Sequence, residues 1–151
     1  MKGRGAQINP DNPFSKHRSA RHPDLTFSKP AEEVNTEYLE THAKTIINKV
    51  DSPDIGLEYS MNPYQGCEHG CVYCYARNTH PYWGYSAGID FESKILVKRD
   101  APQLLAKKLS SPNWVVAPIM LSGNTDCYQP VEAKLKITRQ LLEVLERFHH
   151  P

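Results

Sequence analysis

The sequence predicts an α/β fold with a parallel sheet, preceded by a polar extension. Residues 94–98 form an apolar strand candidate, and a helix follows to about residue 109. A second apolar run at 115–121 precedes a long helix that begins near Pro130. Strands that alternate with helices along a chain are typical of parallel sheets, because each helix returns the chain to the start of the next strand.

Residues 1–30 form a basic, proline-rich segment. It carries six lysines and arginines against two aspartates, a net charge of +4, together with four prolines. With few large apolar residues, it cannot bury enough surface to offset the entropy of ordering it. We therefore expect a flexible, solvated extension. The alternative is that this segment contacts the phosphates of a nucleic acid. Residues 31–54 are expected to be a mixed or helical lead-in.

The next segment combines a weak strand signal with two loops. Leu57, Tyr59 and Met61 alternate with polar residues, which favours a short strand, and Pro63 ends it. Gly66 and Gly70 then predict a tight loop. An ordered loop rich in aromatic and turn-forming residues is expected at 78–90.

The remaining elements are predicted from apolar spacing. Leu104, Leu105 and Leu109 place one apolar face on the helix that ends near residue 109. The run at 115–121 fits a strand buried on both faces, although Pro118 removes a ladder donor and can delay its start. The chain stops directly after the last helix, where a parallel sheet needs another strand, so we expect a fragment of a larger domain.

Composition places the chain in the cytosol. No apolar run approaches the roughly 20 residues that span a bilayer, and the first thirty residues contain no signal-peptide core. The formal net charge of +1 favours neither a nucleic-acid nor a membrane partner for the chain as a whole. In a reducing compartment, clustered cysteines indicate a metal site before they indicate disulfides.

Three of the four cysteines are clustered in a pattern that favours an iron–sulfur cluster. Cys67, Cys71 and Cys74 have the spacing Cys-x3-Cys-x2-Cys, and Cys127 stands apart. Thiolates are the usual ligands of such clusters. Three thiolates on a four-iron cluster leave one iron open to bind a substrate or cofactor, whereas a fully ligated cluster could only pass electrons. The missing fourth ligand therefore points to chemistry at the metal.

Two alternatives remain open for the cysteines. The first is a structural zinc site with His69 or His80 as the fourth ligand, although such sites usually show two ligand pairs separated by a spacer. The second is an electron-carrying cluster completed by Cys127. We expect Cys127 to be an ordinary small apolar residue and His69 to be a loop residue.

The cysteine loop resembles that of the radical S-adenosylmethionine superfamily. Residues 62–77 read NPYQGCEHGCVYCYAR, which has that family's cysteine spacing and an aromatic residue, Tyr73, before the third cysteine. Together with residues 125–126 and 128–130, this stretch is similar to a bacterial branch grouped with spore photoproduct lyases, whose members are often labelled DNA repair photolyase. The resemblance covers about residues 55–151.

The resemblance implies a fold, two cofactors and a reaction. The fold would be the N-terminal part of a parallel (β/α) partial TIM barrel over residues 55–151. The cofactors would be a [4Fe-4S] cluster on the three cysteines and S-adenosyl-L-methionine on its open iron. One electron from the reduced cluster would cleave the sulfonium to methionine and a 5′-deoxyadenosyl radical, which abstracts hydrogen from a substrate.

The resemblance also implies contacts and partners. Tyr73 would lie near the adenine, and the loop after the second strand would meet the cofactor's amino group. That loop consists of Gly123, Asn124, Thr125 and Asp126 and lacks the family's usual Gly-Gly-Glu form. Alternatively, these residues form a turn or a helix cap and bind no ligand. A one-electron reductant of the flavodoxin or ferredoxin type is implied, and DNA is a candidate substrate.

Overall fold

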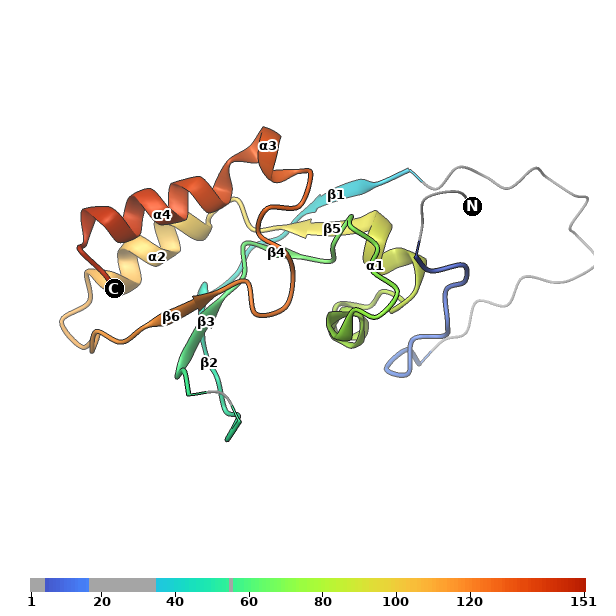
Figure 1. The fold of residues 1–151 in the computed structure, drawn as a ribbon, viewed down its shortest axis with the longest axis horizontal. Coiled ribbons are helices and arrows are strands. Elements are labelled where there is room, and N and C mark those ends of the chain that lie inside the picture. Colours follow the sequence, from blue (N-terminus) through green and yellow to red (C-terminus); the bar gives the residue numbers. More distant parts are fainter. Residues whose placement is uncertain (1–4, 17–34, 55) are drawn as a thin grey trace, which may run out of the picture.

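The strands of the protein form two three-stranded sheets (Figure 1). The computed structural model describes residues 5–16, 35–54 and 56–151. In the first sheet, the central strand β5 (Lys94–Val97) pairs in parallel with β1 (Glu37–Glu40). Its other edge pairs antiparallel with β4 (Tyr64–Gln65). This sheet therefore mixes both strand directions.

The second sheet is also mixed. Its central strand β3 (Tyr59–Met61) pairs antiparallel with β2 (Ile47–Lys49) and parallel with β6 (Ile119–Leu121). Strands β3 and β4 are separated by two residues but belong to different sheets. Pro63 lies between them, lacks an N–H group, and accepts a hydrogen bond from the Lys98 backbone at 3.1 Å. Pro63 therefore marks the corner at which the chain changes sheets.

Four α-helices and one 3₁₀ helix complete the described fold. The longer helices α2 (Ala101–Leu109) and α4 (Ile137–Arg147) lie side by side (Figure 1). Helices α1 (Ile89–Ser93) and α3 (Glu132–Leu135) are short. The 3₁₀ helix η2 (Tyr75–Trp83) follows the cysteine loop and contacts α1. None of the helices in the described residues is both long enough and apolar enough to cross a membrane.

The prediction that the chain forms part of a parallel (β/α) barrel is wrong. A barrel requires successive strands to align in parallel within one sheet, whereas β5 and β6 lie in different sheets and β2 and β4 run antiparallel to their partners. The described chain is a small α/β domain with two mixed sheets. The sequence-based prediction missed β1 and β2, which lie in the lead-in at 31–54, because their residues are largely polar and exposed.

The apolar run at 115–121 is also less buried than predicted. Val115 and Val116 are 76% and 63% exposed, and β6 begins only at Ile119, directly after Pro118. The strand is half-buried along its length. The proline therefore delays the regular strand, as its missing N–H group predicts, but the two valines before it do not join the core.

One apolar core joins both sheets to the two long helices. Leu105 is fully buried on α2, and Leu104 and Leu109 pack beside it, which confirms the predicted inner face of this helix. The buried members of the core are Ile46, Ile47, Met61, Tyr64, Ile95, Val97, Ala101, Leu105, Val131, Ile137 and Leu141. The sheets are thus fixed to one another mainly through the side chains that they bury against α2 and α4.

The predicted long helix after Pro130 is divided at Lys136. Lys136 adopts a left-handed conformation, with φ of 54°, between α3 and α4. The carboxylate of Glu132 then accepts hydrogen bonds from the backbone of Thr138 at 3.0 Å and Arg139 at 3.2 Å. It also accepts the phenol of Tyr64. Glu132 therefore caps the first turn of α4 and ties it to strand β4.

We predict that Tyr64→Phe destabilises the protein by about 1.5–3 kcal/mol, because a buried hydrogen bond to a charged acceptor is lost. Burial raises the pKa of Tyr64, and the contact with Glu132 raises it further. The phenol therefore keeps its proton and is the donor of this hydrogen bond. Urea unfolding measures the loss. Tyr128→Phe is the matched control, since Tyr128 is 66% exposed. Equal effects of the two substitutions would contradict the role of Tyr64.

Candidate functional site

Two glycines shape the cysteine loop. Gly66 and Gly70 have φ of 84° and 63°, which side chains disfavour. A Cβ at Gly66 would lie 3.0 Å from the carbonyl oxygens of Phe91 and Lys94, and one at Gly70 would lie 2.9 Å from the carboxylate of Glu92. The loop therefore turns tightly and packs directly on α1, as its glycines predict.

The side chain of Gln129 holds the first turn of the loop. It is fully buried, donates to the Gly66 carbonyl at 3.1 Å, and accepts from the Glu68 backbone at 3.2 Å. The Glu68 carboxylate in turn accepts from the Val131 backbone at 3.1 Å and from the Tyr38 hydroxyl at 2.9 Å. The segment after β6 therefore contacts the cysteine loop at two points, through the Gln129 side chain and through the Val131 backbone.

Arg77 holds the second turn. Its guanidinium donates two hydrogen bonds to the Cys71 carbonyl, at 3.0 and 3.2 Å, and another to the Gly88 carbonyl at 3.1 Å. It also forms an ion pair with Glu92, whose side chain is fully buried. Because both partners are shielded from water, this pair fixes the end of the loop to α1 more firmly than an exposed pair would.

A segment of the expected extension packs against the same region. The backbone N–H groups of Gly5 and Ala6 donate to the Glu92 carboxylate at 3.1 and 2.8 Å. Ser86 donates to the Pro10 carbonyl at 2.6 Å, and Phe14 stacks on Tyr82 with ring centroids 4.7 Å apart. Residues 5–16 thus make the contacts of an anchored segment, and the rest of the extension lies outside the described residues.

The three thiols occupy this loop but do not converge on one point. Cys67 is buried, and Cys74 packs with it against Phe91. Among the described residues, no three Cys, His, Asp or Glu side chains come close enough together to hold a metal ion. The donor chemistry of the three thiols fits an iron–sulfur cluster, and binding one requires the thiols to move closer together.

Cys67 lies against the second predicted loop. Burial raises the pKa of its thiol, and backbone hydrogen bonds from His69 and Asp126 oppose that rise. The sulfur of Cys67 is therefore adjacent to the backbone of Asp126. The structure thus places the cysteine loop against the loop at 123–126.

Residues 123–126 make contacts within the protein. The Gly123 carbonyl accepts the Tyr75 hydroxyl, and the Asn124 backbone donates to the Asn62 side chain at 2.9 Å. The Thr125 hydroxyl donates to the Tyr64 carbonyl at 2.8 Å and is buried. These bonds fix the loop between the two sheets, so its hydroxyl and one of its amides already have protein partners.

The other candidate residues are spread around the loop. Tyr73 is 86% exposed. His69 pairs with Asp126, with 3.1 Å between Nε2 and Oδ2, whereas His80 is fully buried near Tyr85 and Phe91. Cys127 is buried, close enough to Tyr64 to act on the pKa of its phenol.

Sequence reasoning did not identify Glu92, or the bridging role of Gln129, among the features that hold the loop. Gln129 belongs to a motif that resembles a known family. No local sequence pattern, however, predicts that its side-chain amide is buried and bridges two backbone groups. Glu92 and Arg77 are 15 residues apart and meet only because η2 folds back on α1. One general argument was available from the sequence: a buried irregular loop needs partners elsewhere in the chain for its backbone hydrogen-bonding groups.

The chain is similar to longer proteins from bacteria and archaea. It is 34% identical over 109 residues to uncharacterized proteins of Mycobacterium tuberculosis and Mycobacterium bovis, which is 72% of this chain and 32% of each relative. It is 32% identical over 111 residues to an uncharacterized protein of Methanocaldococcus jannaschii, which is 74% of this chain and 39% of the relative. The chain thus spans about a third of the mycobacterial relatives' length. No family model and no solved structure matches it.

We predict that Gln129→Leu destabilises the protein by about 2–4 kcal/mol, because it leaves the Glu68 N–H and the Gly66 carbonyl without their buried partner. Urea unfolding measures the loss, and amide hydrogen exchange at Glu68 locates it. Gln140→Leu, on the exposed face of α4, is the matched control. Unchanged exchange at Glu68 would contradict the bridging role.

We predict that His80 makes stability fall at acid pH. Burial lowers the pKa of its imidazole from 6.5 to about 4. The stability that the neutral ring contributes is complete above pH 6.5 and is lost as the pH falls toward 4, because the unfolded chain takes up the proton first. The expected loss from His80 between pH 7 and pH 5 is about 2 kcal/mol. His80→Phe should flatten the urea-unfolding profile by that amount.

Proposed function

We propose that this chain carries the cofactor-cleaving site of a radical S-adenosylmethionine enzyme. Cys67, Cys71 and Cys74 are the proposed ligands of a [4Fe-4S] cluster. When bound, that cluster supplies one electron for reductive cleavage of S-adenosyl-L-methionine. The observation that carries the proposal is the presentation of three thiols on one glycine-shaped loop with the spacing x3 and x2.

The surroundings of the loop support this proposal. Gln129 and Arg77 fix the two ends of the loop, while Cys71 and Cys74 are half-buried and so remain reachable for assembly of a cluster. Val72 and Tyr73, between the two half-buried cysteines, are exposed, so this stretch can adjust when the thiols bind a metal. A loop whose backbone is held at Gly66, Glu68 and Cys71, with exposed residues before Cys74, suits ligand assembly.

The cofactor contacts are proposed for the two adjoining loops. Tyr73 is proposed to face the adenine, and Gly123, Asn124, Thr125 and Asp126 to bound the amino-acid end of the cofactor. Asp126 has the strongest claim within its loop, because its carboxylate is half-exposed. One oxygen accepts from the Tyr128 backbone at 2.7 Å, and the other lies 3.1 Å from the His69 imidazole. Thr125 is already engaged with Tyr64 and would act through its backbone.

The proposed setting is the cytosol, with an electron donor of the flavodoxin or ferredoxin type. DNA is the proposed candidate substrate, from the family resemblance and the net +4 charge of residues 1–30. Of the six basic residues in that segment, only Lys16 lies within the described part. Replacing these basic residues by glutamine tests the charge argument without removing the docked residues 5–16. A phosphate-contacting segment makes DNA binding sensitive to salt, so the substitutions should reduce that sensitivity.

We predict that anaerobic reconstitution with iron and sulfide loads about four irons per chain. Alanine at any of Cys67, Cys71 or Cys74 should lower the iron content several-fold, since each removes one of three ligands. Cys127→Ala is the matched control and should leave the iron content unchanged, because Cys127 is buried near Tyr64. Iron and sulfide analysis gives the first readout, and 5′-deoxyadenosine formed after reduction with dithionite gives the second.

Three results would contradict this assignment. Stoichiometric zinc with no iron would support a structural zinc site. Equal loss of iron from Cys127→Ala would indicate a four-cysteine cluster that carries electrons. An intact cluster that yields no 5′-deoxyadenosine in the full-length protein would remove the cofactor cleavage while leaving the metal site in place.

A further inference from the structure

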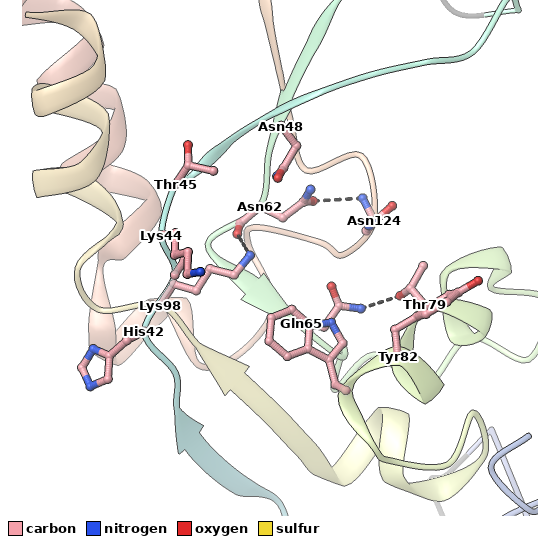
Figure 2. A pocket seen from close by; sticks show the side chains of 12 residues that line it. His42, Lys44, Thr45, Asn48, Asn62, Gln65, Thr79, Tyr82, Lys98 and Asn124 are labelled. Carbon is pink, nitrogen blue, oxygen red and sulfur yellow. Dashed lines mark hydrogen bonds between the residues drawn. The ribbon is translucent and has the colours of Figure 1, made fainter. Parts of the chain in front are cut away.

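A cavity of about 510 Å³ lies beside the cysteine loop and contains none of the cysteines (Figure 2). Its volume falls within the range of sites that bind small organic molecules. The residues that line it are His42, Ala43, Lys44, Thr45, Asn48, Asn62, Gln65, Thr79, Tyr82, Trp83, Lys98 and Asn124. The set contains two lysines and a histidine but no aspartate or glutamate.

Lys98 is the unusual member of this lining. It is only 7% exposed, and its ammonium donates to the Asn62 carbonyl at 2.9 Å. Within the described part of the chain, it forms no ion pair with a carboxylate. Asp100 acts on it from a greater distance and pairs instead with His42, at 3.8 Å on the rim. Burial lowers the pKa of Lys98, and the charge of Asp100 opposes that shift.

The fold fixes this ammonium in position. Lys98 directly follows strand β5, and its backbone N–H is bound to Pro63 at the corner between the sheets. The acceptor, Asn62, is itself held because its side chain accepts a hydrogen bond from the Asn124 backbone at 2.9 Å. Figure 2 shows Lys44 and Asn48 entering from the neighbouring segment, so a second cation lines the same cavity.

An aromatic wall completes the cavity. The Lys98 ammonium lies 5.9 Å from the ring centroid of Trp83, which is 42% exposed. Tyr82 also lines the cavity, and Gln65 is fixed by a hydrogen bond to the Thr79 hydroxyl. A planar ring could therefore rest on Trp83 while polar groups on the opposite wall orient it.

We propose that this cavity binds a nucleoside monophosphate or a closely related phosphorylated aromatic ligand. Its phosphate, which carries a charge of about −1.5 to −2 at neutral pH, lies between Lys98 and Lys44, and its base rests against Trp83. Two ammonium groups and no acid in the lining match that charge. The proposal rests on the cavity alone and requires neither a cluster nor cleavage of S-adenosyl-L-methionine.

The test uses Trp83 as the reporter. The chain has two tryptophans, so Trp114→Phe leaves Trp83 as the only indole. Titration of this variant, without metal, with AMP and dTMP should change its fluorescence saturably. Adenosine and inorganic phosphate, each supplying half of the ligand, should bind at least tenfold more weakly. Phosphate binding as tightly as AMP would show a free-anion site and would overturn the base contact.

Lysine variants test the phosphate contacts. In the Trp114→Phe background, Lys98→Met should weaken AMP binding at least tenfold, and Lys44→Met, at an exposed position that the fold does not need, by threefold or more. Lys108→Met, exposed on α2, is the matched control and should have no effect. Unchanged AMP affinity in both cavity variants would overturn the proposal, as would the absence of saturable binding.

Asn124 lines this cavity and is also one of the proposed cofactor contacts, so S-adenosyl-L-methionine is tested as a competitor of AMP. S-adenosyl-L-methionine carries an adenine but no phosphate, so it should not displace AMP from the metal-free protein. Displacement at comparable concentrations would assign the cavity to that cofactor and overturn the proposal. Failure of AMP binding together with normal cluster assembly would reject this inference and leave the proposed function standing.

Discussion

The irregular cysteine loop must find hydrogen-bond partners for its backbone outside any helix or sheet, and the rest of the site follows from that need. Gln129 serves the first turn and Arg77 serves the second. Each comes from a different segment, one after β6 and one within η2. Because an unpaired buried amide costs about 1–3 kcal/mol, the loop keeps its shape only while both segments are docked.

The same requirement connects the loop to distant parts of the chain. The Oε1 atom of Glu92 accepts from both Arg77 and the Ala6 backbone, and its Oε2 atom accepts from the Gly5 backbone. The loop at 123–126 reaches the opposite side through Tyr75 and Asn62. The cavity lined by Lys98 includes that same Asn62 and also Asn124, so the cavity and the proposed cofactor contacts share residues of one loop and its support.

Local features of this fold were predictable from the sequence, and pairings between distant segments were not. Gly66, Gly70 and Pro63 act on their own backbone, so the tight loop and the end of β3 were expected. The apolar spacing of Leu104, Leu105 and Leu109 likewise identifies the buried face of α2. In contrast, β1 carries exposed glutamates and is recognisable only through its partner β5. Gln129 and Lys98 are polar residues whose burial depends wholly on tertiary contacts.

The docking of residues 5–16 has a kinetic consequence. Their long-range hydrogen-bond partners lie 69 to 87 positions further along the chain, so this segment cannot dock before η2 and α1 exist. Contacts of such long range form late, because the intervening chain must first be closed into a loop. Their removal should then accelerate unfolding more than it slows folding. Residues 5–16 would then mainly slow the unfolding of a domain that has already assembled, including Glu92 and the cysteine loop that Arg77 holds to it.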